Sequence, residues 1–143
     1  MLIIGAILAE VSKLKPHEDI NKNYIFKIKE SIINEGIKFP IIADKDSNII
    51  LDGHHRFNIF KELKIGIIPV FYVDYFDEKI IVDSWNGKNV TKQDVIKSAN
   101  SGKIFPSKTT KHLFVSKKGI VHISSIVPRI NIDIYKLVNL MEG

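Results

Sequence analysis

The segment from Asp52 to Arg56, with the sequence Asp-Gly-His-His-Arg, combines residue types that can bind a phosphate group. The apolar residues before it predict a strand, and those after it recur at helical spacing, so a strand passes through Gly53 into a helix. A helix start offers unpaired N–H groups and the positive end of the helix dipole, and glycine lets the backbone approach a ligand closely. Arginine can hold a phosphate through two parallel hydrogen bonds. We therefore expect Gly53, His54, His55 and Arg56 to form a phosphate site.

The carboxylate of Asp52 stands at the end of the preceding strand. A hard oxygen there suits Mg²⁺, which commonly also bridges phosphates. The structural alternative is that Asp52 caps the helix and the histidines lie on the surface. A zinc site is less favoured, because adjacent histidines on a helix point in different directions and no further ligand has the usual spacing.

A second candidate is the run Lys108-Thr109-Thr110-Lys111-His112, which carries two cations, two hydroxyls and an imidazole. Residues 105–112 show no apolar periodicity, so we expect a loop, and such a loop can wrap an anion with side-chain and backbone donors. The alternative is a solvated basic loop. The candidate gains weight only in combination with the phosphate site around Gly53.

Two further positions could contribute to a site. Glu18 follows Lys15-Pro16-His17, and a carboxylate fixed behind a proline turn can act as a general base. The alternative is that Glu18 only stabilises the start of the next helix through its dipole. Trp85 is the single tryptophan, and it suits either core packing or the wall of a ligand site.

Composition limits the classes of protein that fit. The 143 residues are 45% hydrophobic and 26% charged, which predicts one globular domain over residues 1–143. The absence of Cys excludes disulfides, thiolate zinc sites and cysteine nucleophiles. The net charge of +5 suits phosphate-bearing partners but equally a solvated lysine-rich surface. The early apolar run is too short to span a bilayer and lacks a basic leader, so we expect a soluble cytoplasmic protein without membrane contacts.

The elements that must position these residues alternate between strands and helices. The expected strands are 2–11, 39–43, 48–51, 67–75, 79–84, 113–116 and 120–124. The expected helices start near Ile20 and stop at Gly36, follow Arg56 up to Gly66, run from a Thr91 cap to Ser101, and start at an Asn131 cap near the C-terminus. This pattern predicts an α/β or α+β domain with a mixed sheet.

The motifs also resemble a known family. Lys15-Pro16-His17-Glu18, Leu51 to Arg56, Trp85 and Lys108 to His112, in that order, are similar to motifs of the archaeal free L-serine kinases of the ParB/sulfiredoxin fold. The resemblance covers roughly residues 10–114. It implies a ParB/sulfiredoxin-like nucleotide-binding domain that makes O-phospho-L-serine. The chain departs from the pattern in a shorter segment after Trp85, in Asn86-Gly87 instead of an aromatic-proline pair, and in Lys111 instead of arginine, so either ADP or ATP fits as the phosphoryl donor.

The resemblance also implies roles for the residues. Glu18 would accept the proton of the serine hydroxyl, and Asp52 would hold Mg²⁺. The implied phosphate-binding residues are Gly53, His54, His55, Arg56, Lys108, Thr109 and Thr110, with His54 also catalytic. The implied substrate-binding residues are Trp85, Lys111 and His112.

The implied partners are L-serine and a nucleotide, and we expect a monomer or a small homo-oligomer. The lack of Cys excludes sulfiredoxin chemistry, and too few residues follow the motifs for a full DNA-binding module. Two alternatives stay open. One is a non-catalytic ParB-like nucleotide-binding switch that contacts nucleic acid, and the other is a kinase for another small hydroxylated metabolite. The kinase interpretation requires Glu18, the turn at Gly53 and the segment near Thr110 to share one pocket.

Overall fold

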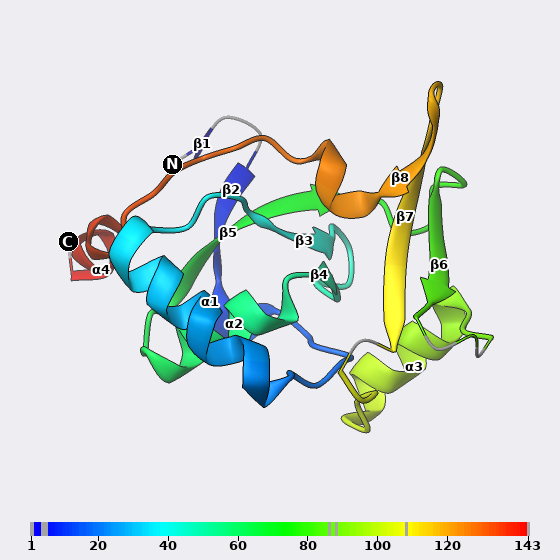
Figure 1. The fold of residues 1–143 in the computed structure, drawn as a ribbon, viewed down its shortest axis with the longest axis horizontal. Coiled ribbons are helices and arrows are strands. Elements are labelled where there is room, and N and C mark those ends of the chain that lie inside the picture. The colour runs from blue at the N-terminus through cyan, green and yellow to red at the C-terminus, as the bar shows by residue number, and fades with distance from the viewer. Residues whose placement is uncertain (1, 4–5, 86, 88, 108, 143) are drawn as a thin grey trace.

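Two β-sheets and four α-helices build the structure, a computed structural model that describes residues 2–3, 6–85, 87, 89–107 and 109–142 (Figure 1). The larger sheet has five strands in the order β1-β2-β5-β3-β4, and the smaller has three in the order β6-β7-β8. Their bounds are β1 Leu2–Ile3, β2 Ala6–Glu10, β3 Ile41–Asp44, β4 Ile50–Asp52, β5 Ile67–Val73, β6 Ile80–Ser84, β7 Thr110–Ser116 and β8 Gly119–His122.

The helices lie between the strands in the chain. They are η1 Val11–Lys13, α1 Lys22–Glu35, α2 His54–Glu62, α3 Lys92–Ser101, η2 Ile123–Ile126 and α4 Ile134–Glu142, where η denotes a 3₁₀ helix. Within the described ranges, none of these helices combines the length and the apolar character needed to cross a bilayer.

The larger sheet is mixed, as the sequence predicts. Strand β3 pairs in parallel with β5 and antiparallel with β4, whereas β2 runs antiparallel to β5. Helix α2 lies on the path that connects β4 to β5, and it packs beside α1 (Figure 1). The loop between β4 and α2 therefore lies at the edge of the larger sheet, close to β7 of the smaller sheet.

Strand β3 separates two apolar cores. Successive strand residues face opposite sides, so Ile41 packs into one core with Phe60 of α2, and Ile42 packs into the other with Val95 of α3. Ile41, Phe60, Ile42 and Val95 are all fully buried. The second core joins the two sheets, because it also contains residues of β4 and β6.

The helix signals in the sequence are confirmed at two positions. Helix α1 ends at Gly36, whose φ of +80° is the left-handed region that glycine adopts readily. Thr91 and Asp94 form the expected capping box, because each side chain accepts a hydrogen bond from the other residue's backbone N–H.

The predictions for the two chain ends need correction. The expected single strand over residues 2–11 is instead the antiparallel pair β1 and β2, and residues 4–5 between them lie outside the described ranges. The final helix begins at Ile134, and Asp133 rather than Asn131 accepts the backbone N–H of Tyr135 at its start.

The region around the smaller sheet also differs from the prediction. The expected loop over residues 105–112 ends earlier, since β7 begins at Thr110. The strand expected over residues 120–124 ends at His122, where the chain turns into η2. Thr110 and His112 are buried polar strand residues, which an apolar periodicity does not detect.

Candidate functional site

A cavity of about 220 Å³ lies where β4, the start of α2 and β7 meet. It brings together the three stretches that the kinase interpretation requires. Its lining residues are Glu18, Asp19, Leu51, Asp52, Gly53, His54, His55, Trp85, Ser107, Thr110, Lys111, His112 and His122.

Gly53 lets the chain turn from β4 into α2 at the cavity wall. Its φ is +106°, a backbone conformation that residues with a Cβ rarely adopt. A Cβ on Gly53 would also lie 2.4 Å from Cγ2 of Ile41, so the turn packs directly on β3. Gly53, His54 and His55 at the start of α2 line the cavity, and the N–H groups of a helix start can bind anions.

The two histidines at the start of α2 are held by backbone groups. His54 Nε2 accepts a hydrogen bond of 3.2 Å from the backbone N–H of His17, and His55 Nε2 accepts one of 2.9 Å from Asn21. A neutral imidazole whose Nε2 accepts carries its proton on Nδ1. Burial holds the pKa of His54 well below its usual value, so this ring is neutral. Its Nδ1 lies 3.9 Å from Glu18 Oε2.

Glu18 is a buried carboxylate surrounded by donors. Oε1 accepts the backbone N–H of Thr109 at 2.5 Å and that of Thr110 at 3.4 Å, and Oε2 lies 3.4 Å from the Thr110 hydroxyl. Burial raises the pKa of Glu18 to about 6, although these hydrogen bonds act in the opposite direction. A carboxylate with a pKa near neutrality suits general acid–base chemistry.

The backbone around Glu18 is fixed by the loop that precedes β7. Phe105 donates its N–H to the carbonyl of His17 at 2.8 Å and accepts the N–H of Asp19 at 2.7 Å. The hydroxyl of Ser98, on α3, also donates to the His17 carbonyl at 3.1 Å. Glu18 therefore enters the cavity from a segment that is held on both sides.

Trp85 and Lys111 form one part of the cavity rim. Trp85 is 57% exposed, and Nζ of Lys111 lies 4.8 Å from the centre of its ring, the geometry of a cation–π contact. The ring of His122 lies 6.5 Å from that of Trp85. The exposed tryptophan supports the ligand-wall interpretation over core packing.

Deeper in the same wall, β7 directs His112 toward the second core. His112 Nε2 is 2.9 Å from the hydroxyl of Tyr75, and burial lowers the pKa of His112 to about 3. His112 is therefore neutral at physiological pH, so any contact that it makes with a substrate is a neutral hydrogen bond.

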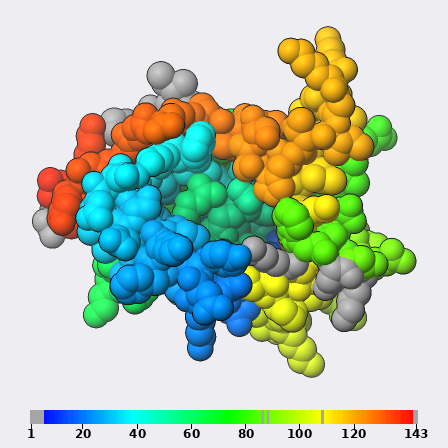
Figure 2. All heavy atoms as spheres, viewed as in Figure 1, coloured from blue at the N-terminus to red at the C-terminus, as the bar shows by residue number. Residues whose placement is uncertain are grey.

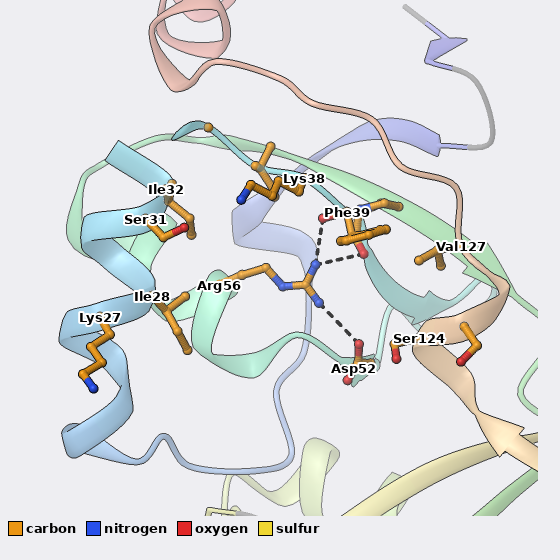
Figure 3. A pocket seen from close by; sticks show the side chains of 14 residues that line it. Lys27, Ile28, Ser31, Ile32, Lys38, Phe39, Asp52, Arg56, Ser124 and Val127 are labelled. Atoms are coloured by element: carbon orange, nitrogen blue, oxygen red, sulfur yellow. Dashed lines mark hydrogen bonds and ion pairs between the residues drawn. The ribbon is translucent and has the colours of Figure 1, made fainter. Parts of the chain in front are cut away.

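Arg56 does not line the 220 Å³ cavity but points into a larger one of about 610 Å³ (Figure 3). Its guanidinium donates to the carbonyls of Phe39 at 2.7 Å and Pro40 at 3.1 Å, and its Nη2 lies 3.3 Å from Asp52 Oδ2. Asp52 lines both cavities and marks the place where they adjoin. In Figure 2 the surface of the protein is hollowed between α1, in blue and cyan, and the orange segment that follows β8.

The remaining predicted residues differ in their placement. Thr109 contributes its backbone N–H to Glu18, while its hydroxyl donates to the carbonyl of Pro106 at 2.6 Å, and it does not line the 220 Å³ cavity. Thr110 does line it. Lys108 lies outside the described residues.

Four polar residues of the site region were not assigned a role from the sequence. Asp19, Ser107 and His122 line the cavity, and His17 lies directly behind it. The position of His17 and Asp19 beside Glu18 was a usable signal. Nothing in the local sequence indicates His122, because the pairing of β7 with β8 alone brings it to the cavity.

Comparisons with known proteins add independent evidence. No protein-family model matches the sequence. An ATP-dependent L-serine kinase of Staphylothermus marinus is 37% identical over 87 residues, which cover 57% of this chain and 34% of the relative. An ADP-dependent L-serine kinase of Thermococcus kodakarensis is 31% identical over 87 residues, covering 57% of this chain and 36% of the relative. A ParB-like protein of Sulfolobus acidocaldarius is 38% identical over 74 residues, which cover 52% of this chain and 37% of the relative.

A solved free serine kinase in complex with AMP has a TM-score of 0.71 and 15% identity to this chain, covering 84% of it and 92% of the kinase chain. The chain has the fold of the free serine kinases. The comparisons thus confirm the resemblance inferred from the motifs and, with the ParB-like relative, the ParB/sulfiredoxin-like fold. The alignments span about a third of the length of the curated relatives.

Proposed function

We propose that this chain is a free L-serine kinase that transfers a phosphoryl group from ADP or ATP to the serine hydroxyl and yields O-phospho-L-serine. The observation that carries the proposal is the single cavity shared by Glu18, the start of α2 and residues 110–112 of β7. The similarity to relatives named L-serine kinases supports serine as the acceptor. Because those relatives are named ATP-dependent and ADP-dependent, the proposal includes both donors.

Glu18 is the proposed general base. As the serine oxygen forms a bond with the terminal phosphorus, its proton passes to Glu18, and the bond from that phosphorus to the bridging oxygen of the nucleotide breaks. Glu18 lies within a buried wall of donors, and its pKa of about 6 leaves it mostly ionised at pH 7 and above. The His54 Nδ1–H faces the same carboxylate and can stabilise charge that develops beside it.

The start of α2 is the proposed phosphate site. Gly53, His54 and His55 offer backbone N–H groups and imidazole N–H donors at the cavity wall. Of the two threonines that the resemblance assigns to phosphate binding, Thr110 lines the cavity from β7, and in this proposal both act through their bonds to Glu18. Lys108 is proposed as a further phosphate-binding residue on the sequence resemblance alone.

The donor set fits magnesium. Mg²⁺ is usually bound through one or two carboxylates together with substrate phosphates and water. Asp52 supplies a carboxylate where the two cavities adjoin, next to the proposed phosphate site. When bound, Mg²⁺ would neutralise charge on the phosphates during transfer.

The larger cavity is the proposed site of the nucleoside. Its volume of about 610 Å³ lies in the range of about 300–1,000 Å³ that is usual for small-molecule sites. Arg56 crosses it and, through Phe39 and Pro40, holds the wall that faces α1 (Figure 3). A nucleotide whose phosphates lie at Gly53 would reach this cavity past Asp52, which places Arg56 beside the donor.

The proposed serine site is the wall of the 220 Å³ cavity that Trp85 and β7 form. Trp85, Lys111 and His112 line the cavity, and the Lys111 ammonium is the cation proposed for the serine carboxylate. Holding the carboxylate at this rim would leave the serine hydroxyl free to point toward Glu18.

One observation favours a second function, namely the similarity to a ParB-like protein. In that case the chain would bind nucleotide without turnover and contact nucleic acid through its basic surface.

The test of the proposed function incubates the protein with Mg²⁺, with ADP or ATP, and with a panel of amino acids and small hydroxylated metabolites, and analyses the products by mass spectrometry. We expect O-phosphoserine. Nucleotide binding without any phosphorylated product, together with salt-sensitive DNA binding, would support the switch instead.

A further inference from the structure

His17 connects α2 and β7 although it does not line the cavity. It is fully buried, and its backbone N–H donates to His54 Nε2 at 3.2 Å. On the other side, its ring Nε2 lies 3.0 Å from the hydroxyl of Thr110. Its ring also packs edge-on against His54, with 4.5 Å between ring centres.

The direction of the hydrogen bond between His17 and Thr110 follows from counting protons. The Thr110 hydroxyl has one proton, and an ionised Glu18 accepts it at Oε2, 3.4 Å away. The bond between Thr110 Oγ1 and His17 Nε2 must then use a proton from the histidine. His17 would therefore donate to Thr110, and Thr110 to Glu18.

Burial keeps the ring of His17 neutral. It lowers the pKa of His17 to about 4, although a hydrogen bond with the backbone of Ile50 acts in the opposite direction, so the ring carries one proton. The proton count at Thr110 therefore places that proton on Nε2.

We propose that His17 is a positioning residue for Glu18: its Nε2–H holds the Thr110 hydroxyl so that this hydroxyl donates to the carboxylate. The chain from His17 through Thr110 to Glu18 keeps one Glu18 oxygen directed at a donor while the other is held by the backbone of Thr109. Without His17, the Thr110 hydroxyl could rotate away, and the carboxylate would lose its fixed orientation. The competing explanation is that His17 only fills space among buried rings.

The proposal makes a spectroscopic prediction that is independent of catalysis. Histidine ring ¹⁵N shifts at pH 7.5 should show His17 as the Nε2–H tautomer and the neighbouring His54 as the Nδ1–H tautomer. Thr110→Val, which removes the hydroxyl at nearly constant volume, should shift the His17 Nε2 signal and leave the His54 signals in place. A His17 ring protonated on Nδ1 would overturn the proposal.

The kinetic test rests on the proposed kinase function and compares two amides. In His17→Gln, the amide nitrogen takes the place of Nε2 and can still donate to Thr110, whereas in His17→Asn the amide is too short to reach it. We expect His17→Asn to lower kcat about 10-fold or more with little change in KM for serine, and His17→Gln to restore most of kcat. Thr110→Val should lower kcat similarly, and His17→Asn combined with Thr110→Val should cost no more than either alone.

Tyr72→Phe is the matched control, because it removes a hydroxyl that donates to Asn48 Oδ1 at 3.1 Å, and neither residue lines the cavity. It should lower the melting temperature and leave kcat unchanged. Equal kcat losses in His17→Gln and His17→Asn, or additive losses in the double variant, would show that His17 only fills space. A wild-type protein that phosphorylates no acceptor would refute the kinase function, and the tautomer measurement would still decide the role of His17.

Discussion

Glu18→Gln should have opposite effects on activity and on stability. In the folded protein, burial raises the pKa of Glu18 from its usual 4.5 to about 6. The folded state therefore binds the proton more tightly than the unfolded state does, so stability falls as the pH rises from about 4.5 to 6. Glu18 is only 8% exposed, so solvent screens this effect little.

The size of the effect follows from the two pKa values. The rise from 4.5 to about 6 corresponds to about 2 kcal/mol of destabilisation once Glu18 is ionised. Glutamine never ionises, so the free energy of unfolding of Glu18→Gln relative to the wild type should rise by about 2 kcal/mol between pH 4 and pH 8. At the same time, the loss of the base should lower kcat about 100-fold or more while nucleotide affinity persists.

The assay is urea unfolding of both proteins at several pH values between 4 and 8, together with steady-state kinetics at pH 8. Glu30→Gln, which removes an exposed carboxylate on α1, is the control and should show no pH-dependent difference in the free energy of unfolding. A constant difference between Glu18→Gln and the wild type across the pH range would refute the argument that burial raises the pKa of Glu18. Unchanged kcat in Glu18→Gln would remove Glu18 from the mechanism.

Three further predictions concern the rest of the site. Asp52→Asn should raise the Mg²⁺ concentration needed for half-maximal activity, whereas an equal loss at every Mg²⁺ concentration would make Asp52 purely structural. Gly53→Ala should lower the free energy of unfolding in urea by about 3 kcal/mol, because it adds a strained φ and an overlap with Ile41. Gly102→Ala, with a similar φ of +76° but no neighbour within 4 Å, should cost only about 1 kcal/mol, and equal losses would disprove the overlap. The fluorescence of Trp85 should change when serine or nucleotide binds, and a constant emission under saturating ligand would place Trp85 outside the site.

Local sequence signals were sufficient where one segment carries its own determinants. Gly53 with the helical spacing after Arg56 located the start of α2, and Thr91 with Asp94 located the start of α3. Each of these features depends on residues within one turn of one another, so the printed sequence contains the whole interaction.

The features that were missed depend on contacts between distant segments. Arg56 turns to the carbonyls of Phe39 and Pro40, which no spacing within its own helix indicates. Strand β7 begins at Thr110, which pairs with Ser84 of β6, and Glu18 and Tyr75 provide partners for the buried side chains of Thr110 and His112. A strand that contains polar residues with distant partners has no apolar periodicity, so its sequence predicts a loop.

The most direct test of the account is a ³¹P NMR experiment with the protein, Mg²⁺, L-serine and either ADP or ATP, performed in parallel on the wild type and Glu18→Gln. We expect the signal of O-phosphoserine to grow with the wild type. With Glu18→Gln it should be absent or grow at least about 100-fold more slowly, while both proteins bind the nucleotide with the same Kd. Nucleotide binding by the wild type without any O-phosphoserine signal would contradict the account.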